Sequence, residues 1–314
     1  MAYIIFLTGM FFLIVGGNVL VDSSIIIARK LKISPLLIGI FLIGFGTSMP
    51  ELTTSLLAVA RRAEGIAIGN VVGSNIANIL LVLGVAAFIK PIKIHTPSFG
   101  RDAIFLGLAT IILLISLLAG HISWELGALM CMTLAFYVYH AYQTDKEHIK
   151  TQSIELPRIA LAKRFHLPTY LSIILAISGL VLMLLGAHMV VNSVILLASH
   201  WGISETLIGL TIVAFGTSLP ELVTAIIASL KKQSDLVIGN VVGSNIYNAL
   251  FILGFTALFL PVSVPLTVKP NVLIMTAATM LLLGLGWWHG KISKRIGLLF
   301  ILMYFSYIFY VGMA

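Results

Sequence analysis

The sequence predicts an all-α polytopic membrane protein of ten transmembrane helices, arranged as two inverted-topology repeats of five helices each. Three observations lead to this prediction: a very apolar composition, ten apolar runs of membrane-spanning length, and an internal repeat. The chain has 314 residues, of which 60% are hydrophobic and 10% are charged, and its mean hydropathy is +1.11. A soluble protein of this length could not bury so much apolar surface in its core, so most of the chain is expected to contact lipid.

Ten apolar runs are long enough to cross a hydrocarbon layer of about 30 Å, which takes roughly 17–25 helical residues. The first run has no positively charged segment before it and no small-residue cleavage site. We therefore expect a transmembrane helix there and not a removable signal peptide. The only long polar segment separates the fifth run from the sixth. The predicted crossings are residues 3–28, 35–60, 66–89, 102–120, 123–142, 169–198, 205–230, 236–260, 271–289 and 296–313.

The basic residues predict the orientation of these crossings. With ten helices, sixteen of the 19 Lys and Arg residues fall on one side of the membrane, and only Arg61, Arg62 and Lys269 fall on the other. The positive-inside rule assigns the richer side to the cytoplasm, so both termini are expected to be extracytoplasmic. Residues 1–142 would then form the first repeat, 143–168 a central cytoplasmic loop, and 169–314 the second repeat. The net charge of +8 fits loops that face acidic headgroups and argues against a nucleic-acid partner.

The internal repeat becomes visible when the sequence is aligned with itself at an offset of 170 residues. This offset superposes FGTSMPEL at residues 45–52 on FGTSLPEL at 215–222, without a gap. It also superposes IGNVVGSNI at residues 68–76 on an identical nonapeptide at 238–246. Because the repeat unit holds five crossings, an odd number, the second copy enters the membrane from the opposite side.

The second crossing combines a helix break with a charge at the depth of the bilayer centre. Thr47 and Glu51 are four residues apart and share a helix face, with Ser48 one position away. Pro50 has no N–H, and its ring crowds the carbonyl of Gly46, so carbonyls around this position leave the helical hydrogen-bond ladder. In lipid an unpaired carbonyl costs several kcal/mol unless another group binds it, and a metal cation would suit that role.

The third crossing supplies neutral oxygen atoms, because Ser74 and Asn78 share one helix face. The pseudo-two-fold axis of an inverted repeat brings equivalent residues together near the membrane midplane. We therefore expect Glu51 to lie close to Glu221. We also expect Ser74 and Asn78 to lie close to their counterparts in the second copy, which are Ser244 and Asn248.

The chemistry of this set of ligands favours hard cations. Carboxylate, hydroxyl, amide and carbonyl oxygens suit Ca²⁺ with its 6–8 ligands, and they suit Na⁺ as well. Cys131 is the only cysteine, which excludes an intramolecular disulfide and a Cys-based metal cage. Two mid-membrane carboxylates must be neutralised by protons or cations, and one Ca²⁺ or two or more Na⁺ would do so equally well. That equivalence predicts competition at a shared site.

Each of these residues also has a structural interpretation. The prolines could simply kink their helices, and Ser74 and Ser244 could be small residues that allow close packing. Asp22 and its counterpart Asn192 fall near a membrane edge, where snorkelling or helix pairing is expected, and His188 is interpreted as a structural histidine. Hydrogen bonds across helices and caps on the broken segments are expected for Asn70, Asn75, Asn240 and Asn245.

The motifs GTSMPE, GNVVGSNIAN, GTSLPE and GNVVGSNIYN resemble the two alpha repeats of the sodium/calcium exchanger family, within the cation/calcium antiporter superfamily. The resemblance covers nearly the whole chain and both signature regions. The short central loop makes the chain similar to compact prokaryotic members. The resemblance implies that crossings 2, 3, 7 and 8 form an ion core, across which two long tilted helices, crossings 1 and 6, slide between inward-open and outward-open states.

The resemblance also implies which residues bind ions. Glu51 and Glu221 would ligate Ca²⁺ together with the carbonyls of Thr47 and Thr217. The sodium sites would share these carboxylates and add side-chain and backbone oxygens, with two amides completing the central position. The added residues are Ser48, Ser218, Ser74, Ser244, Gly44, Ala214, Asn78 and Asn248.

The leading functional hypothesis is therefore a secondary antiporter that exchanges Na⁺ for Ca²⁺ in the plasma (inner) membrane of a prokaryote, with no cofactor and no enzymatic activity. An H⁺-coupled or K⁺-dependent calcium/cation antiporter is the alternative within transport. The amide of Asn248, where potassium-dependent relatives carry Asp, argues against a need for K⁺. A cation channel and an intramembrane hydrolase are the alternatives from other classes, and the ion core offers no His or Lys base for the latter. The oligomeric state stays open, and a monomer would be sufficient.

Overall fold

A computed structural model describes residues 2–94, 99–151, 168–200, 214–265 and 268–313. Within these residues seven helices are long and apolar enough to cross a membrane, and an eighth span results if one bent helix pair is counted. The chain is therefore an all-α, multi-pass membrane protein. The predicted residues 152–167 of the central loop and residues 205–213 of the seventh crossing lie outside the described part.

The helices follow the predicted apolar runs closely. One difference concerns α8, which continues to Thr151, nine residues beyond the predicted end of the fifth crossing. The elements of the first half are α1 (Ala2–Leu31), α2 (Pro35–Ile38), η1 (Gly39–Gly44), α3 (Phe45–Thr47), α4 (Met49–Ala60), α5 (Glu64–Ile76), η2 (Ala77–Val82), α6 (Leu83–Ile89), β1 (Ile92–Lys93), α7 (Phe99–Leu118), β2 (His121–Ile122) and α8 (Trp124–Thr151). Those of the second half are α10 (Thr169–His200), α12 (Ala214–Thr217), α13 (Leu219–Leu230), α14 (Ser234–Ile246), η4 (Tyr247–Ile252), α15 (Leu253–Phe259), β3 (Val262–Ser263), α16 (Lys269–Trp288), β4 (Lys291–Ile292) and α17 (Lys294–Met313).

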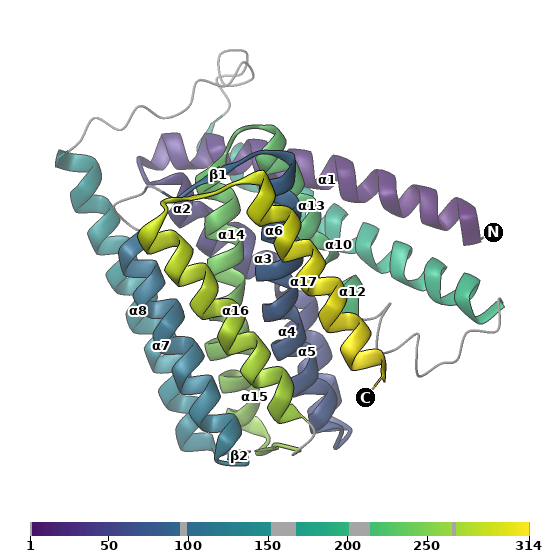
Figure 1. Ribbon diagram of the computed structural model, residues 1–314. Coiled ribbons are helices and arrows are strands. Elements are labelled where there is room, and N and C mark those ends of the chain that lie inside the picture. Colours follow the sequence, from purple (N-terminus) through teal and green to yellow (C-terminus); the bar gives the residue numbers. More distant parts are fainter. Residues whose placement is uncertain (1, 95–98, 152–167, 201–213, 266–267, 314) are drawn as a thin grey trace.

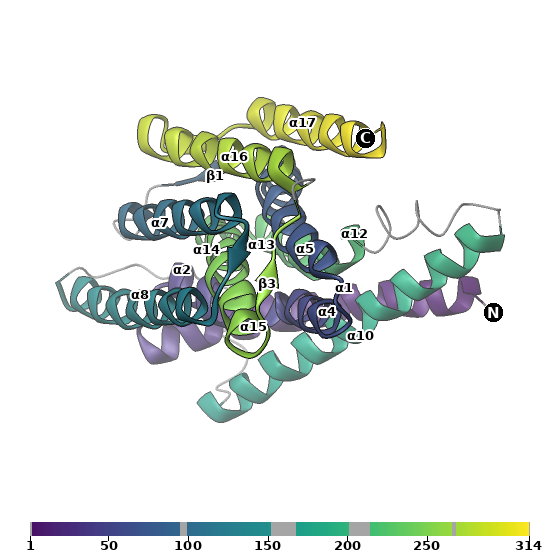
Figure 2. The same cartoon turned by 90° about the horizontal axis from the view of Figure 1, so that it is seen from below.

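Helices α1 and α10 lie side by side and cross the other long helices obliquely (Figures 1 and 2). Glycines make this close packing possible. A Cβ atom at Gly16 would lie 2.6 Å from the carbonyl oxygen of Gly179, and one at Gly9 would lie 2.8 Å from that of Gly186. Backbone therefore packs against backbone at two levels, as small residues allow in membrane helix pairs. The two helices form one tightly joined unit.

The centre of the protein is the helical span of residues 234–259, and 94% of its most apolar window is buried, against 17% for α17. Helix α14 packs against α2, η1 and α13, so it contacts both broken spans. A Cβ atom at position 243 would lie 2.8 Å from Cα of Ile40, so the two backbones would have to separate to admit it. The glycines of the second copy of the nonapeptide, Gly239 and Gly243, thus bring two backbones together.

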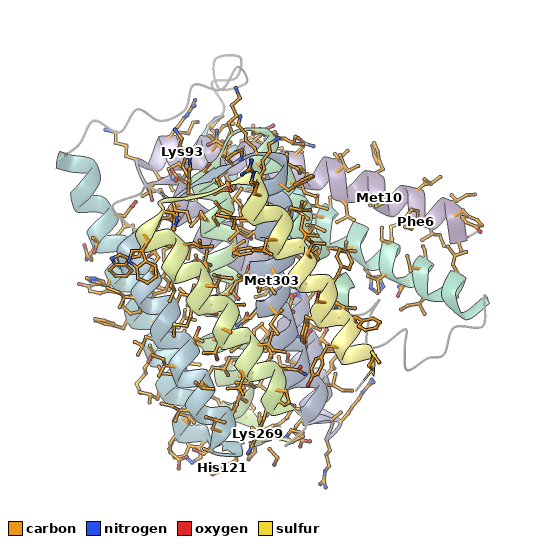
Figure 3. All side chains as sticks on the ribbon, in the orientation of Figure 1. Phe6, Met10, Lys93, His121, Lys269 and Met303 are labelled. Carbon is orange, nitrogen blue, oxygen red and sulfur yellow. The ribbon has the colours of Figure 1, made fainter. Side chains whose placement is uncertain are left out.

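Two short antiparallel ladders connect the two halves of the chain. Strand β1 pairs with β4, with Ile92 opposite Ile292, and β2 pairs with β3, with His121 opposite Ser263. Figure 1 shows β1 and β2 at opposite ends of the helical bundle. In Figure 3 the side chains of Lys93 and Lys269 also lie at opposite ends, in agreement with their prediction for opposite membrane faces.

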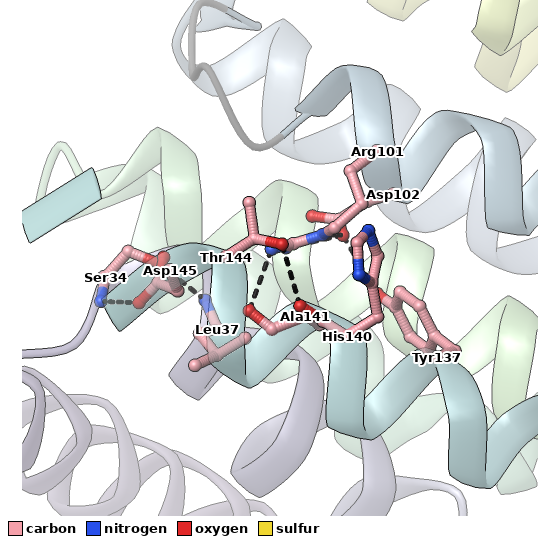
Figure 4. Close-up of polar contacts among 9 residues, drawn as sticks. All are labelled: Ser34, Leu37, Arg101, Asp102, Tyr137, His140, Ala141, Thr144 and Asp145. Carbon is pink, nitrogen blue, oxygen red and sulfur yellow. Dashed lines mark hydrogen bonds and ion pairs between the residues drawn. The ribbon is translucent and has the colours of Figure 1, made fainter. Parts of the chain in front are cut away.

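A buried ionic network ties α7 and α8 to the start of α2 (Figure 4). The Arg101 guanidinium lies 2.6 Å from Oδ1 of Asp102, which also accepts a hydrogen bond of 3.2 Å from the Tyr137 hydroxyl. On the same face of α8, Oδ2 of Asp145 accepts a 2.8 Å hydrogen bond from the backbone N–H of Ser34, the N-cap residue of α2. This network fixes the beginning of the broken span that carries the first candidate carboxylate.

Candidate functional site

Both broken spans are interrupted at the serine of the repeated octapeptide. Ser48 has φ −82° and ψ 6°, Ser218 has φ −87° and ψ 4°, and both lie outside helical geometry. In the first span the helices before and after the break differ in direction by 41°. Each proline occupies the start of the helix that follows, where its missing N–H leaves no hydrogen bond unmade. The break predicted from the sequence is thus confirmed at both positions.

The break places each candidate carboxylate in the first turn of a helix, Glu51 in α4 and Glu221 in α13. The positive end of a helix dipole stabilises a carboxylate at this position. Thr47 and Thr217 end the preceding helical segments, so the negative ends of those segments lie within a few residues of the carboxylates. Such discontinuous helices are how membrane transporters bring backbone oxygens to a binding site.

Glu51 and Glu221 are each 1% exposed and lie close enough for their charges to interact directly. The predicted proximity of the two residues is confirmed. The hydroxyl of Ser48, in the first half, approaches Oε1 of Glu221 in the second half at 3.4 Å, and the hydroxyl of Ser74 approaches Oε1 of Glu51 at the same distance. The Thr217 side chain also contacts the Glu51 carboxyl group. Each carboxylate is therefore contacted by a side chain from the other half of the chain.

Several residues predicted to bind ions carry buried oxygen atoms without a hydrogen-bond donor among the described residues. Oε2 of Glu51 and Oε2 of Glu221 are inaccessible to solvent and have no hydrogen-bond partner among the described residues. The same is true of the Ser218 hydroxyl and of the amide oxygens of Asn78 and Asn248. Buried polar atoms are normally satisfied, so unsatisfied acceptors on two carboxylates and on other predicted ligands favour a cation as the missing partner.

The neutral wall of the site is formed by the repeated nonapeptides. In the second copy, Ser244 is fully buried, and its hydroxyl donates a 3.3 Å hydrogen bond to the carbonyl of Gly44. In the first broken span, the Thr47 hydroxyl donates a 2.9 Å hydrogen bond to the carbonyl of Ile43. The backbone of Ala214 begins α12, three residues before Thr217.

Asn70 and Asn240 join each broken span to the helix that follows it. The Asn70 amide donates to the carbonyl of Glu51 at 3.1 Å, and the Asn240 amide donates to the carbonyl of Glu221 at 3.2 Å. Asn240 also donates to the Thr224 hydroxyl at 3.2 Å. The predicted hydrogen bonds of these asparagines across helices are confirmed.

We expect Asn240→Ala to lower ion transport by about tenfold and to lower the midpoint of thermal unfolding. The substitution leaves the Glu221 carbonyl and the Thr224 hydroxyl without a donor, which costs about 1–3 kcal/mol. Transport by reconstituted protein and thermal unfolding in detergent would measure the two effects. Asn271→Ala, in the first turn of α16, is the matched control and should change neither. Unchanged transport in both variants would contradict the bracing role.

One local feature of the site, its π-helical segments, could not be predicted from the sequence. Asn78 lies in η2 and Asn248 lies in η4, and Gly44 ends η1. Single π-helical turns are rare and occur often at functional sites, because the wider turn redirects side chains and backbone carbonyls. The asparagines themselves were predicted, but no residue pattern in these segments distinguishes a π-helical turn from an α-helical one.

A cavity of about 410 Å³ reaches the edge of the site. It lies between α4, α10 and α12, and its lining includes Pro50 and Thr217, which flank the two breaks, and His188 of α10. Thr53 and Thr54 line the part beyond Pro50 along α4. The site is therefore approached from the face of the membrane towards which α4 runs.

Broken helices that meet around buried carboxylates, inside a multi-pass helical bundle, define a membrane carrier of the secondary-transporter class. The family model described as "Sodium/calcium exchanger protein" matches residues 1–143 and 171–313. The chain belongs to the sodium/calcium exchanger family, as its motifs indicated. Proteins of this family are exchangers and not enzymes, and they carry cations across membranes.

Three similar proteins agree with this assignment along nearly their full length. The "Putative antiporter CaxA" of Alkalimonas amylolytica is 36% identical, over 93% of this chain and 92% of its own. The "Sodium/calcium exchanger MaX1" of Methanosarcina acetivorans is 30% identical, over 96% and 98%. Among solved structures, the sodium-calcium exchanger NCX_Mj soaked with 2.5 mM Na⁺ and 10 mM Sr²⁺ superposes with a TM-score of 0.84 at 31% identity, over 98% of this chain and 97% of its own.

Proposed function

We propose that this chain is a secondary antiporter that exchanges Na⁺ for Ca²⁺ at a site centred on Glu51 and Glu221. The observation that carries the proposal is the pair of buried carboxylates, each with one oxygen that has no hydrogen-bond partner among the described residues. Neutral oxygens from both halves surround them. This is a set of hard ligands, and among the described residues no cluster of three or more His, Cys, Asp and Glu side chains points to a softer metal.

Charge balance explains why exchange follows from such a site. Two carboxylates in a low-dielectric environment repel each other and require about two positive charges. One Ca²⁺ supplies both, and so do two Na⁺. The empty site carries two unbalanced buried charges. Switching its access from one side of the membrane to the other without bound ions is therefore unfavourable, and this couples the two ion flows.

The proposed ligands divide according to the type of oxygen they offer. Glu51 and Glu221 supply the charge, and the carbonyls of Thr47 and Thr217 complete the calcium position. Side-chain and backbone oxygens around them would serve sodium, and the two amides would complete the central position. These residues are Ser48, Ser218, Ser74, Ser244, Gly44, Ala214, Asn78 and Asn248.

The proposal includes the arrangement of the chain in the membrane. Ten crossings would form two inverted repeats, residues 1–142 and 169–314, joined by a cytoplasmic loop at 143–168. Matching contacts in the two copies support this arrangement, for example those of Asn70 with Glu51 and of Asn240 with Glu221. The Lys and Arg distribution favours both termini outside the cytoplasm, in the plasma membrane of a prokaryote.

Ion flux through purified protein in liposomes tests the function. Vesicles loaded with Na⁺ are diluted into Na⁺-free medium that contains labelled Ca²⁺, while K⁺ and the pH gradient are varied independently. We expect Ca²⁺ uptake that requires the Na⁺ gradient and is unchanged when K⁺ is removed, since Asn248 adds no third carboxylate to the site. Uptake driven by a pH gradient and not by Na⁺ would support the H⁺-coupled alternative. Uptake without any counter-gradient would support a channel.

A further inference from the structure

An ion pair joins the oblique helix pair to the ion core at one face of the protein. Nζ of Lys231, at the end of α13, lies 2.7 Å from Oδ1 of Asp22 on α1. The same ammonium group approaches the carbonyl of Asn18, one turn earlier on α1, at 3.5 Å. Directly below, Gly17 faces Ile227, because a Cβ atom at Gly17 would lie 2.7 Å from Cδ1 of Ile227. Helices α1 and α13 are therefore in close contact, and the ion pair covers the end of that contact.

The opposite face lacks the chemistry for the same contact. At an offset of 170 residues, Asp22 corresponds to Asn192, Lys231 to Arg61, and Asn18 to His188. An amide cannot form an ion pair with an arginine, and the Asn192 amide lies 2.9 Å from Nε2 of His188 on its own helix. In place of a closed contact, the structure has the cavity of about 410 Å³, with His188 in its lining.

The two faces of the protein therefore differ in both chemistry and packing. The face with Lys231 is closed by α1 against α13, and among the described residues the face towards which α4 runs is open beside Pro50 and Thr217. Helix α1 is joined to α10 through the glycine contacts at Gly16 and Gly9, so a tie on α1 also holds α10. A single ion pair can thus restrain the whole oblique pair relative to the ion core.

We propose that the ion pair of Asp22 and Lys231 is a one-sided latch that keeps the cytoplasmic approach to the cation site closed. The inference rests on the proposed exchange by alternating access, in which the oblique pair must move to expose the site to the second side. Because only one of the two copies can form the ion pair, the latch stabilises the state that is open to the extracytoplasmic side. It acts on access and not on ion ligation.

The side chains of Lys231 and Asp22 are 26% and 22% exposed. A partly exposed ion pair contributes little to overall stability. Even such a small free-energy contribution, if it favours one of two conformations, changes their ratio by about fivefold. A latch is therefore expected to alter accessibility strongly while leaving thermal unfolding almost unchanged, which distinguishes it from an ordinary structural ion pair.

Cysteine accessibility tests the latch without relying on transport. Cys131→Ser removes the only cysteine, and Ile227→Cys then places a probe in the contact beneath the ion pair. Ile227 is 6% exposed, so a membrane-impermeant maleimide should react slowly. In sealed vesicles with the cytoplasmic side accessible, we expect Asp22→Asn and Lys231→Met each to speed labelling about fivefold. Lys232→Met, at the neighbouring exposed lysine, is the matched control and should change nothing.

Exchanging the two charges decides whether the ion pair itself is responsible. The double variant Asp22→Lys, Lys231→Asp should return labelling to the slow rate, whereas each single reversal should not. Labelling unaffected by Asp22→Asn, or fast labelling in the double variant, would overturn the latch. If the labelling pattern holds but wild-type vesicles show no Na⁺-driven Ca²⁺ uptake, the latch stands and the proposed function fails. If uptake is normal but the variants label at the wild-type rate, the latch fails and the proposed function stands.

Discussion

Glu51→Gln and Glu221→Gln are each expected to lower Na⁺-driven Ca²⁺ uptake by about 100-fold or more. Each change removes half of the negative charge from a site in which both carboxylates are 1% exposed. Removing one member of a buried set of charges typically costs about 3–5 kcal/mol, and each 1.36 kcal/mol corresponds to a factor of ten. Initial rates of labelled Ca²⁺ uptake into Na⁺-loaded proteoliposomes measure the effect.

Glu125→Gln is the matched control for both variants, because Glu125 also lies in the first turn of a helix, α8, but is exposed. It should transport at the wild-type rate. The two glutamine variants should still fold, since the amide keeps the shape of the side chain and removes the repulsion between two buried carboxylates. Wild-type uptake by either variant would refute the cation site as proposed.

Gly243→Ala is expected to abolish most of the transport activity and to lower the thermal midpoint by several degrees. The added methyl group would lie 2.8 Å from Cα of Ile40 and 3.0 Å from its carbonyl oxygen, so two backbones must separate. Overpacking of this kind typically costs about 1–3 kcal/mol. Ser244, the next residue, holds the carbonyl of Gly44, and the displacement would therefore reach the ligand set directly.

Gly107→Ala provides the comparison for this variant. Its added methyl group would meet only Cδ1 of Leu283, at an ordinary distance of 3.5 Å, in the middle of α7. Alanine is the better helix former, so the thermal midpoint should stay the same or rise slightly. Light-scattering or tryptophan-based thermal unfolding of both variants in one detergent would measure the difference. Equal stability of the two would show that α14 and η1 can separate without cost.

The sequence could predict the helices because the thickness of the bilayer fixes their length. Apolar runs located the ends of α1, α10, α17 and the continuous span from α5 to α6 to within about three residues. The prediction was less good at the end of α8, where a charged helix continues beyond the apolar run to Thr151. Hydropathy marks where lipid ends, and it does not mark where a helix leaves the membrane and continues in water.

The candidate site was predictable because the repeat points to the same residues twice. Glu51 and Glu221 could be expected to meet, since an inverted repeat has only one way to bring equivalent positions together. The π-helical turns at Asn78 and Asn248 could not, because hydrogen bonding to the fifth residue depends on tertiary packing. The network of Asp102 and Arg101 was also missed, since a charge at the first turn of a crossing resembles any residue at the membrane surface.

The two strand ladders have a consequence for how the protein is made. Ile92 cannot meet Ile292 until the ribosome has added 200 further residues, and His121 waits similarly for Ser263. During this time the polar edges of β1 and β2 have no partner strand, and the carboxylate of Glu51 has no second half around it. Such distant pairings are slow to form and expose intermediates to misassembly. Truncation shortly before β4 should therefore yield a nascent chain that membrane quality-control proteases degrade, although most of its helices have already been inserted.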